Sequence, residues 1–252
     1  MALTGRSPAS VALMTLAGKT AVVTGGSRGI GAAIVRRLVA DGARVVFSYR
    51  QDKAAADALA RDAGNAVAVR ADQEDPASLD VLFESVAGGL DILVSNAAIG
   101  PLAPIRDITP ELFDRVMTVN AKFPLLAMQK AEPLLRDGGR IIGISTLNTV
   151  LPGPGLALYC ASKAALEQIT KVAAREFGPR GITVNTVSPG ATDTDLLRSS
   201  NSPEALERTP ALTALGRLGE PEDIADVVAF LAGPDSRWIT GQNIQATGGL
   251  IL

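Results

Sequence analysis

The stretch TAVVTGGSRGIG, residues 20–31, decides the fold of this chain. A short apolar run leads directly into a turn in which Gly25, Gly29 and Gly31 follow a G-x-x-x-G-x-G spacing. Glycine permits a tight turn and lets backbone N–H groups approach a phosphate closely. Because exposed N–H groups and the helix dipole favour an anion, the stretch predicts a strand, a pyrophosphate-binding turn and the start of a helix.

The same alternation of strand and helix continues along the chain. Short apolar runs predict strands at residues 20–24, 44–49, 66–70, 91–95, 140–145, 181–187 and 243–246. Longer amphipathic stretches between them predict helices at residues 31–41, 54–63, 156–177 and 221–231. We therefore expect a single α/β domain over residues 17–252, a doubly wound parallel sheet, preceded by a loose N-terminal extension at residues 1–16.

The composition excludes several kinds of chemistry. The 252 residues contain no histidine and one cysteine, Cys160, which removes the common zinc ligand sets and any nucleophile activated by histidine. Lys and Arg number 24 against 26 Asp and Glu, a net charge of −2 that offers no basic footprint for nucleic acid. No apolar run approaches the ~18 residues of a membrane helix. We expect no metal, nucleic-acid or membrane partner, a cytoplasmic location, and proton chemistry that depends on Tyr, Lys, Asp or Glu.

Further segments resemble one family in order and spacing. With the glycine turn, they make the chain similar to the short-chain dehydrogenase/reductase family from about residue 19 to residue 249. The segments are SNAA at 95–98, Asn120, YCASK at 159–163, PGATDT at 189–194, and the C-terminal stretches 217–225 and 239–242. The resemblance implies a Rossmann-type fold and a nicotinamide dinucleotide held by Gly25, Ser27, Arg28, Gly29, Ile30, Tyr49, Arg50, Asp72, Asn96, Tyr159, Lys163, Pro189, Gly190, Thr192 and Thr194.

The end of the second strand indicates which dinucleotide binds. A carboxylate there would accept hydrogen bonds from a ribose 2′-hydroxyl and repel a 2′-phosphate. The strand instead ends FSYR at residues 47–50, and Arg28 lies in the glycine turn. Two guanidinium groups suit a dianionic phosphate, so we predict NADPH rather than NADH. By resemblance, Asp72 contacts the adenine.

Tyr159 and Lys163 are four residues apart in a predicted helix, so they share one face. A nearby ammonium favours the phenolate, and we expect Lys163 to lower the pKa of Tyr159 toward the working range. Tyr159 is then the predicted proton donor to a carbonyl oxygen. The resemblance implies that Lys163 also holds the nicotinamide ribose and that Asn120 organises a water that relays protons to Lys163. A polar residue in a helix interior is the alternative for Asn120.

The family places a serine hydroxyl thirteen residues before its tyrosine, which here is Thr146. Threonine keeps the hydroxyl but adds a methyl group and stiffens χ1. Successive side chains of a strand face opposite sides, so a shift of one residue would present Ser145 instead. We favour Thr146 and keep both residues as candidates.

The loops at residues 147–155 and 192–216 follow strand ends and carry many apolar residues, which suits a ketone with an apolar body. The nearest resemblance within the family is to 3-oxoacyl-acyl-carrier-protein reductases. Asp137 falls where that branch usually has a base, so a free small ketone, a polyketide intermediate and a sugar stay open beside a carrier-linked substrate. Residues 221–231 and the last strand resemble the segments through which members of the family contact other subunits. The resemblance therefore implies a homotetramer.

Two other functions stay open. One is a non-catalytic dinucleotide-sensing protein, for which the change from Ser to Thr is the only support. The other is an NAD-dependent alcohol dehydrogenase, which Arg50 and the missing acid at the end of the second strand disfavour.

Overall fold

The computed structural model describes residues 15–250, and in them seven parallel strands form one sheet. The order across the sheet is β3-β2-β1-β4-β5-β6-β7. The chain begins in the middle of the sheet with β1 and adds β2 and β3 toward one edge. After β3 it returns to place β4 on the other side of β1, so the direction in which strands are added reverses between β1 and β4. The strands are β1 Thr20–Val23, β2 Arg44–Tyr49, β3 Ala66–Arg70, β4 Leu90–Ser95, β5 Leu135–Ile144, β6 Thr183–Pro189 and β7 Asn243–Ala246.

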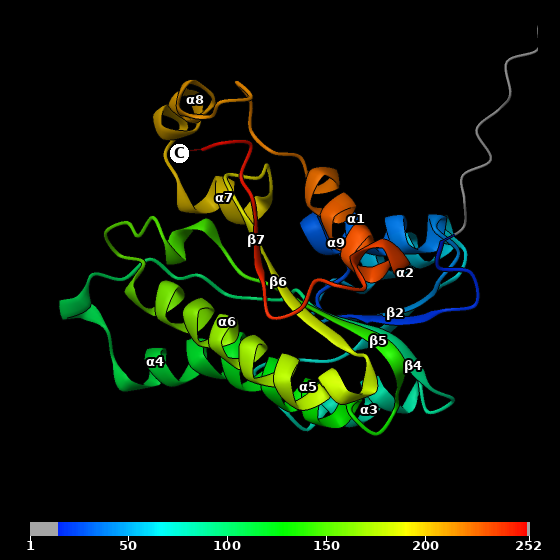
Figure 1. Cartoon of the computed structure of the whole chain (residues 1–252). Coiled ribbons are helices and arrows are strands. Elements are labelled where there is room, and N and C mark those ends of the chain that lie inside the picture. The colour runs from blue at the N-terminus through cyan, green and yellow to red at the C-terminus, as the bar shows by residue number, and fades with distance from the viewer. Residues whose placement is uncertain (1–14, 251–252) are drawn as a thin grey trace, which may run out of the picture.

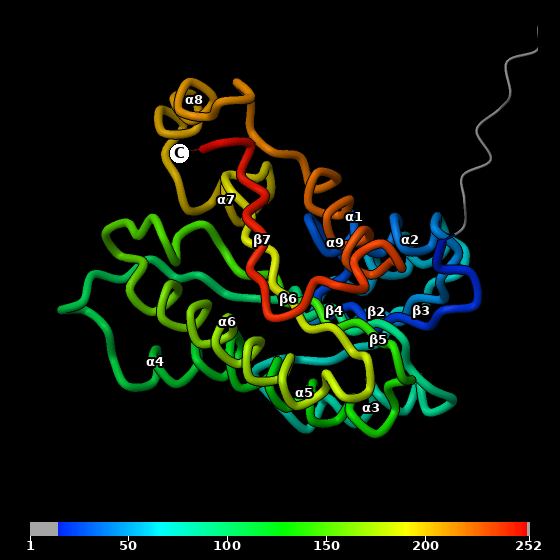
Figure 2. The backbone as a smooth tube through the Cα atoms, in the orientation of Figure 1, coloured from blue at the N-terminus to red at the C-terminus, as the bar shows by residue number. Residues whose placement is uncertain are grey.

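Helices cover both faces of the sheet (Figure 1). One layer holds α1 (Gly29–Ala40), α2 (Lys53–Ala63) and α9 (Pro221–Ala232). The other holds α3 (Ser78–Glu84), α4 (Pro110–Met117), α5 (Phe123–Ala131) and α6 (Ala157–Phe177). The tube in Figure 2 shows that α7 (Asp195–Ser200) and α8 (Pro203–Leu212) lie beyond the end of β6.

Side chains alternate between two apolar cores on either side of the sheet. In β1, Ala21 and Val23 pack into the core beneath α1 and α9, whereas Val22 packs into the core that contains Phe123 and Leu166. All three are fully buried. A strand that is apolar on both faces belongs to a sheet covered on both sides. The predicted doubly wound α/β fold is confirmed.

The element boundaries differ from the predicted ones at a few ends. Leu16 was expected in the extension, but it is buried and its backbone N–H donates to the Asp41 carbonyl at 2.9 Å. The folded body therefore already includes Leu16, and residues 1–14 of the predicted extension lie outside the described residues. β5 begins at Leu135, five residues earlier than expected, and ends at Ile144, one residue before Ser145.

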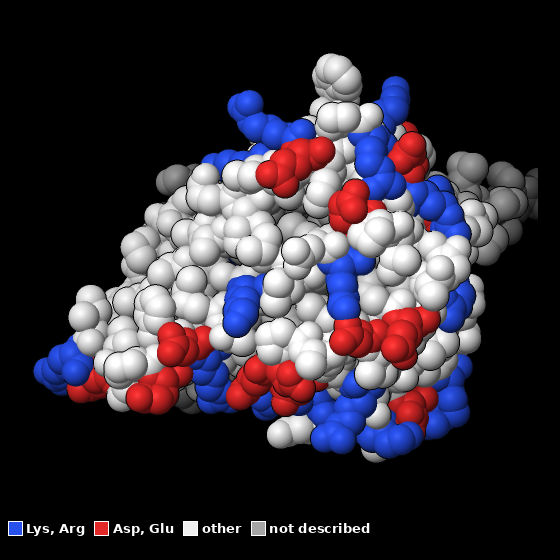
Figure 3. Space-filling model, turned by 90° about the horizontal axis from the view of Figure 1, so that it is seen from below, with Lys and Arg blue, Asp and Glu red and all other residues white. Residues whose placement is uncertain are grey.

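Acidic and basic side chains are interspersed on the face that carries α3, α4 and α5 (Figure 3). Cross-helix pairs such as Lys130 with Asp80 contribute to this mixture. Within residues 15–250, no helix is both long enough and apolar enough to cross a membrane.

Candidate active site

The glycine turn joins β1 to α1 and needs its glycines for space. A Cβ on Gly31 would lie 2.1 Å from the Gly25 carbonyl oxygen, and one on Gly25 would lie 2.5 Å from the Ala97 Cβ. Arg28 precedes α1 in an extended conformation, and its side chain makes no capping hydrogen bond. The first N–H groups of a helix lack partners within the helix. The turn therefore offers the N–H groups and dipole that suit a pyrophosphate.

Neighbouring loops hold this turn in shape. The Asn96 side chain, at the end of β4, donates to the carbonyl oxygens of Thr24 at 3.0 Å and Gly25 at 3.1 Å. The Ser48 hydroxyl accepts from the Gly25 N–H at 2.9 Å. Thr194 caps α7, and its methyl group would be 3.4 Å from a Cβ on Gly29. Asn96 thus fixes the backbone of the glycine turn through its two carbonyl oxygens. The segment 189–194 ends with Thr194 beside Gly29 of the same turn.

Of the two bases expected at the ribose end of the cofactor, Arg50 is paired with an acid that it shares with Arg115, a base that was not expected there. Arg50 follows β2 and donates to Glu74 at 2.8 Å, while Arg115 of α4 donates to the same oxygen at 2.7 Å. The two guanidinium groups lower the pKa of the Glu74 carboxyl, with Arg115 the larger influence. Tyr49 is buried at the end of β2. Arg28 is exposed at the glycine turn, and Asp72 accepts from the Glu74 N–H at 3.0 Å.

The loop after β6 packs closely on the C-terminal segment. A Cβ on Gly190 would lie 2.8 Å from the Thr247 Cα, so the backbones touch where Pro189 leaves the sheet. The Thr192 side chain is buried, and its hydroxyl donates to the Gly190 carbonyl at 3.2 Å. Thr247 therefore helps to set the position of this loop.

Tyr159 and Lys163 lie on one face of α6, as their spacing predicts. The Lys163 Nζ is 5.9 Å from the centroid of the Tyr159 ring and donates to the Ile144 carbonyl at 2.6 Å. Lys163 is only 2% exposed, and burial lowers its pKa to about 8.

The pKa of Tyr159 moves in the direction opposite to the predicted one. Burial raises it above its ordinary value of 10.0, and a hydrogen bond with Thr146 lowers it in part. The expectation that Lys163 dominates this pKa is therefore wrong, because removal of the phenol from water disfavours the phenolate more strongly. The phenol keeps its proton at neutral pH.

The two candidate hydroxyl groups face different partners. The Thr146 hydroxyl lies close enough to the Tyr159 phenol to lower its pKa in part, and it accepts from the Asn148 N–H at 3.2 Å. The Ser145 hydroxyl instead donates to Glu167 at 2.5 Å. Because β5 ends at Ile144, these residues already lie in the following loop, where their side chains diverge. The structure places Thr146, and not Ser145, beside the phenol.

Asn120 is fully buried in a π-helical turn, Thr118–Lys122, between α4 and α5. Its amide donates to the Ile99 carbonyl at 2.7 Å and to the Ser162 hydroxyl at 3.0 Å, and its oxygen accepts from the Ile99 N–H at 2.9 Å. A π-helical turn often marks a functional site. Here it brings Asn120 to the helix segment between Tyr159 and Lys163 and fixes the loop after β4.

A cavity of about 380 Å³ opens between the glycine turn, the loop after β4 and α7. Part of its wall is formed by Gly100, Leu102 and Leu196. Its polar side is formed by Arg28 and Arg115. A Cβ on Gly100 would lie 3.2 Å from the Tyr159 ring, so this part of the wall packs against the side of that ring. Of the apolar loop residues expected around a substrate, Leu196 lines this cavity, while Val150 is largely exposed.

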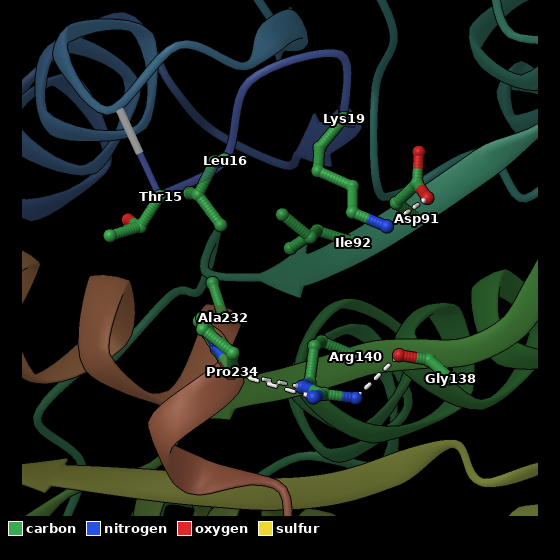
Figure 4. Close-up of a pocket in the computed structure, with 10 residues that line it drawn as sticks. Thr15, Leu16, Lys19, Asp91, Ile92, Gly138, Arg140, Ala232 and Pro234 are labelled. Atoms are coloured by element: carbon green, nitrogen blue, oxygen red, sulfur yellow. Dashed lines mark hydrogen bonds and ion pairs between the residues drawn. The ribbon is translucent and has the colours of Figure 1, made fainter. Parts of the chain in front are cut away.

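A second cavity, of about 170 Å³, lies near the amino ends of β1 and β4 (Figure 4). Lys19 donates to Asp91 at 3.0 Å, and Arg140 donates to the Gly139 carbonyl at 3.0 Å and the Gly233 carbonyl at 3.4 Å. These charged side chains are satisfied by protein groups. The cavity is at the strand ends opposite the glycine turn.

Two acidic residues of the site were missed by sequence reasoning. Glu167 follows Lys163 by four residues on α6, and helical spacing alone could have placed it on the same face. Glu74 lies in the loop after β3, and no sequence pattern brings it to Arg50. Long-range ion pairs of this kind depend on the tertiary fold.

Comparisons with known proteins agree with this geometry. The family model described as enoyl-(acyl carrier protein) reductase matches residues 25–251. A cyclic-di-GMP-binding biofilm dispersal mediator protein of Escherichia coli K12 is 45% identical, over 89% of this chain and 93% of the relative. A solved short-chain dehydrogenase/reductase from Serratia marcescens superimposes with a TM-score of 0.89 at 40% identity, covering 94% of this chain and all of the other. An angucycline C-6 ketoreductase solved with bound NADP gives 0.88 at 44% identity, covering 94% and 97%.

Proposed function

The chain belongs to the short-chain dehydrogenase/reductase family, and from this premise we propose that it is an NADPH-dependent reductase that converts a ketone to an alcohol. The observation that carries the proposal is that the Tyr159 phenol lies near the Thr146 hydroxyl, with the buried Lys163 ammonium 5.9 Å from the centre of its ring. We infer that these three groups form a proton-donating cluster, whose Tyr159 ring packs against Gly100 in the wall of the cavity beside the glycine turn.

The cofactor fits the residues that are present. The uncapped start of α1 suits the pyrophosphate, and Gly25 and Gly31 leave no room for a side chain in that turn. Arg50 and Arg28 suit the 2′-phosphate of NADPH, and related proteins solved with NADP support the same choice. In our proposal Tyr49, Asp72 and Asn96 border the adenosine half and the turn, while Pro189, Gly190, Thr192 and Thr194 border the nicotinamide. When bound, NADPH supplies the hydride.

The protonation of Tyr159 favours reduction as the direction. Because burial keeps the phenol protonated at neutral pH, it can give its proton to a carbonyl oxygen that becomes an alkoxide. The Thr146 hydroxyl hydrogen-bonds that same oxygen and the phenol, which orients both. The charged ammonium of Lys163 stabilises the phenolate that the transfer leaves behind. Asn120 fixes the segments around Ile99 and Ser162, which hold these groups in place.

The substrate class follows from the cavity. Leu102 and Leu196 give it an apolar wall, which suits a ketone with an apolar body. The similarity to an angucycline C-6 ketoreductase supports a ketone as the substrate, which in our proposal is of a polyketide or 3-oxoacyl type. Asp137 pairs with Arg180 at 2.9 Å, so this acid is part of an ion pair where a base would help to dock an acidic carrier. A free ketone is therefore the better-supported substrate.

The assembly is proposed to be a homotetramer in the cytoplasm. β7 is the last strand of the described sheet, and Phe230 of the adjacent α9 is 46% exposed. An exposed strand edge beside an apolar helix surface is a natural contact for a second copy. Light scattering coupled to size exclusion would give four times the mass of the chain, and a monomer would contradict the assembly.

The proposed function is tested by following NADPH and NADH consumption over a panel of ketones. We expect turnover of apolar ketones with NADPH and slower turnover with NADH. Faster turnover with NADH would contradict the cofactor assignment. Tight NADPH binding without turnover of any ketone would favour a binding protein, the kind of function that the name of the Escherichia coli relative states.

A further inference from the structure

Three side chains of α6, each four residues after the last, contact the carboxyl end of β5. Tyr159 meets the Thr146 hydroxyl, Lys163 donates to the Ile144 carbonyl at 2.6 Å, and Glu167 accepts from Ser145 at 2.5 Å. Residues spaced by four lie on one face of a helix. Glu167 therefore continues the line of the two proposed catalytic side chains, although the proposed mechanism does not use it.

Glu167 holds the loop on both sides of Thr146. The same carboxylate oxygen accepts from Ser145, immediately before Thr146, and from the Thr149 hydroxyl at 2.9 Å, three residues after it. Hydrogen bonds to a charged acceptor are stronger than those between neutral groups. The Thr149 hydroxyl also contacts the Thr146 carbonyl at 3.0 Å. The short helical turn Leu147–Thr149 is thus fastened to α6 next to the residue whose hydroxyl meets Tyr159.

The charge of Glu167 also acts on Lys163. Burial lowers the pKa of Lys163, and the Glu167 carboxylate raises it in part. Within residues 15–250, Tyr159 on α6 is a second titratable group that faces Lys163, and β5 contributes the uncharged Ile144 carbonyl. Ser162 and Asn120, from α6 and the π-helical turn, are uncharged polar neighbours of this cluster. Glu167 is therefore the acid that opposes the burial of this ammonium.

We propose that Glu167 is a positioning residue: its carboxylate fixes the segment that carries the Thr146 hydroxyl. The inference rests on the proposed reductase function. It assigns to Ser145 a structural part, as a hydroxyl that fastens the loop to Glu167, and it explains why two adjacent hydroxyl residues follow β5.

Two variants separate the hydrogen bonds of the Glu167 carboxylate from its charge. Glu167→Gln keeps an oxygen that can accept from Ser145 and Thr149 but loses the charge, whereas Glu167→Ala loses both. Glu176→Gln and Glu176→Ala are the matched controls, because Glu176 is exposed on the same helix. The measurements are kcat and KM for NADPH across pH, together with hydrogen exchange of the amides at residues 145–151.

We expect Glu167→Ala to lower kcat by about tenfold or more, with KM for NADPH changed by less than about twofold. Amide exchange at residues 145–151 should become faster in this variant only. The highest kcat of Glu167→Gln should stay within about threefold of the wild-type value, since the glutamine oxygen still holds the loop at residues 145–149. Its activity should be lost at a lower pH than in the wild type, because Lys163 loses the charge that supports its ammonium.

Wild-type kcat and wild-type exchange in Glu167→Ala would overturn the positioning role. If kcat of Glu167→Gln falls at the same alkaline pH as kcat of the wild type, the effect of the Glu167 charge on Lys163 is contradicted. If the wild type turns over no ketone, the proposed function has failed, and the exchange measurement still decides whether Glu167 fixes the segment at Thr146.

Discussion

Lys163 and Ile144 are joined by a hydrogen bond of 2.6 Å from the lysine Nζ to the strand carbonyl oxygen. This bond fixes a fully buried ammonium at the carboxyl end of β5, where the ligand crevice of an open α/β sheet lies. It also holds the ammonium 5.9 Å from the Tyr159 ring centroid. Because of this contact, the positive charge of Lys163 lies inside the candidate active site and not on the protein surface.

Replacement of the two hydroxyl residues should have unequal effects. Thr146→Ala removes the hydroxyl beside the phenol, and we expect kcat to fall by about 10- to 100-fold, the value of a lost hydrogen bond to a developing charge. Ser145→Ala removes one of two hydroxyl groups on Glu167 and should cost no more than about threefold, because the Thr149 hydroxyl still donates to the same carboxylate. The measurement is kcat with NADPH and one ketone.

Thr146→Ser is the matched control, because it keeps the hydroxyl and removes only the methyl group. It should retain most of the activity. A larger loss from Ser145→Ala than from Thr146→Ala would mean that Ser145 supplies the reacting hydroxyl.

The rate of reduction should fall as the pH rises through the pKa of Lys163. Burial lowers this pKa to about 8, so the ammonium is charged below that pH and neutral above it. Because the charged form stabilises the phenolate product, kcat should be full below about pH 7 and decline above about pH 8. The proton on Tyr159 does not limit this range, since burial raises the pKa of the phenol.

The pH profile of kcat checks this directly, with Lys171→Met as a control on the exposed side of the same helix. The control should keep the wild-type profile. A constant kcat up to pH 10 would mean that the charge of Lys163 does not support the reaction.

The choice of cofactor should depend on Arg50. Arg50→Glu places a negative charge where the 2′-phosphate is expected, next to Glu74, and should lower kcat/KM for NADPH by about tenfold or more. The value for NADH, which has no phosphate there, should change by only about twofold. Steady-state kinetics with both cofactors measure the ratio.

Arg61→Glu, an equal change in charge at the exposed far end of α2, should leave the ratio unchanged. Equal losses with both cofactors in Arg50→Glu would contradict a phosphate-reading role for this residue.

The sequence predicted most of the strands and helices, because apolar runs and glycine turns depend on residues that are close together in the chain. Alternating apolar runs located all seven strands, and the glycine turn at Gly25–Gly31 located the start of α1. The ends of β5 were missed at both sides, since Leu135 extends the strand by pairing with Leu90 across a break in the register. That pairing depends on a distant strand and leaves no local signal.

The sequence predicted which candidate site residues lie together, but only part of their electrostatics. Helical spacing placed Tyr159 and Lys163 on one face, and counting along the chain favoured Thr146. The direction of the Tyr159 pKa depends on how deeply α6 is buried, which the spacing does not contain. The contact of Glu167 with Ser145 likewise required the actual path of the chain after Ile144.

The central claim is that Tyr159 gives its proton to a ketone, and Tyr159→Phe tests it most directly. The variant keeps the ring packed against Gly100 and lacks only the phenol hydroxyl. With a ketone that the wild type reduces, we expect kcat to fall by about 10²- to 10⁴-fold while NADPH still binds with an affinity within about threefold of wild type. A variant that still forms alcohol at close to the wild-type rate would contradict the mechanism.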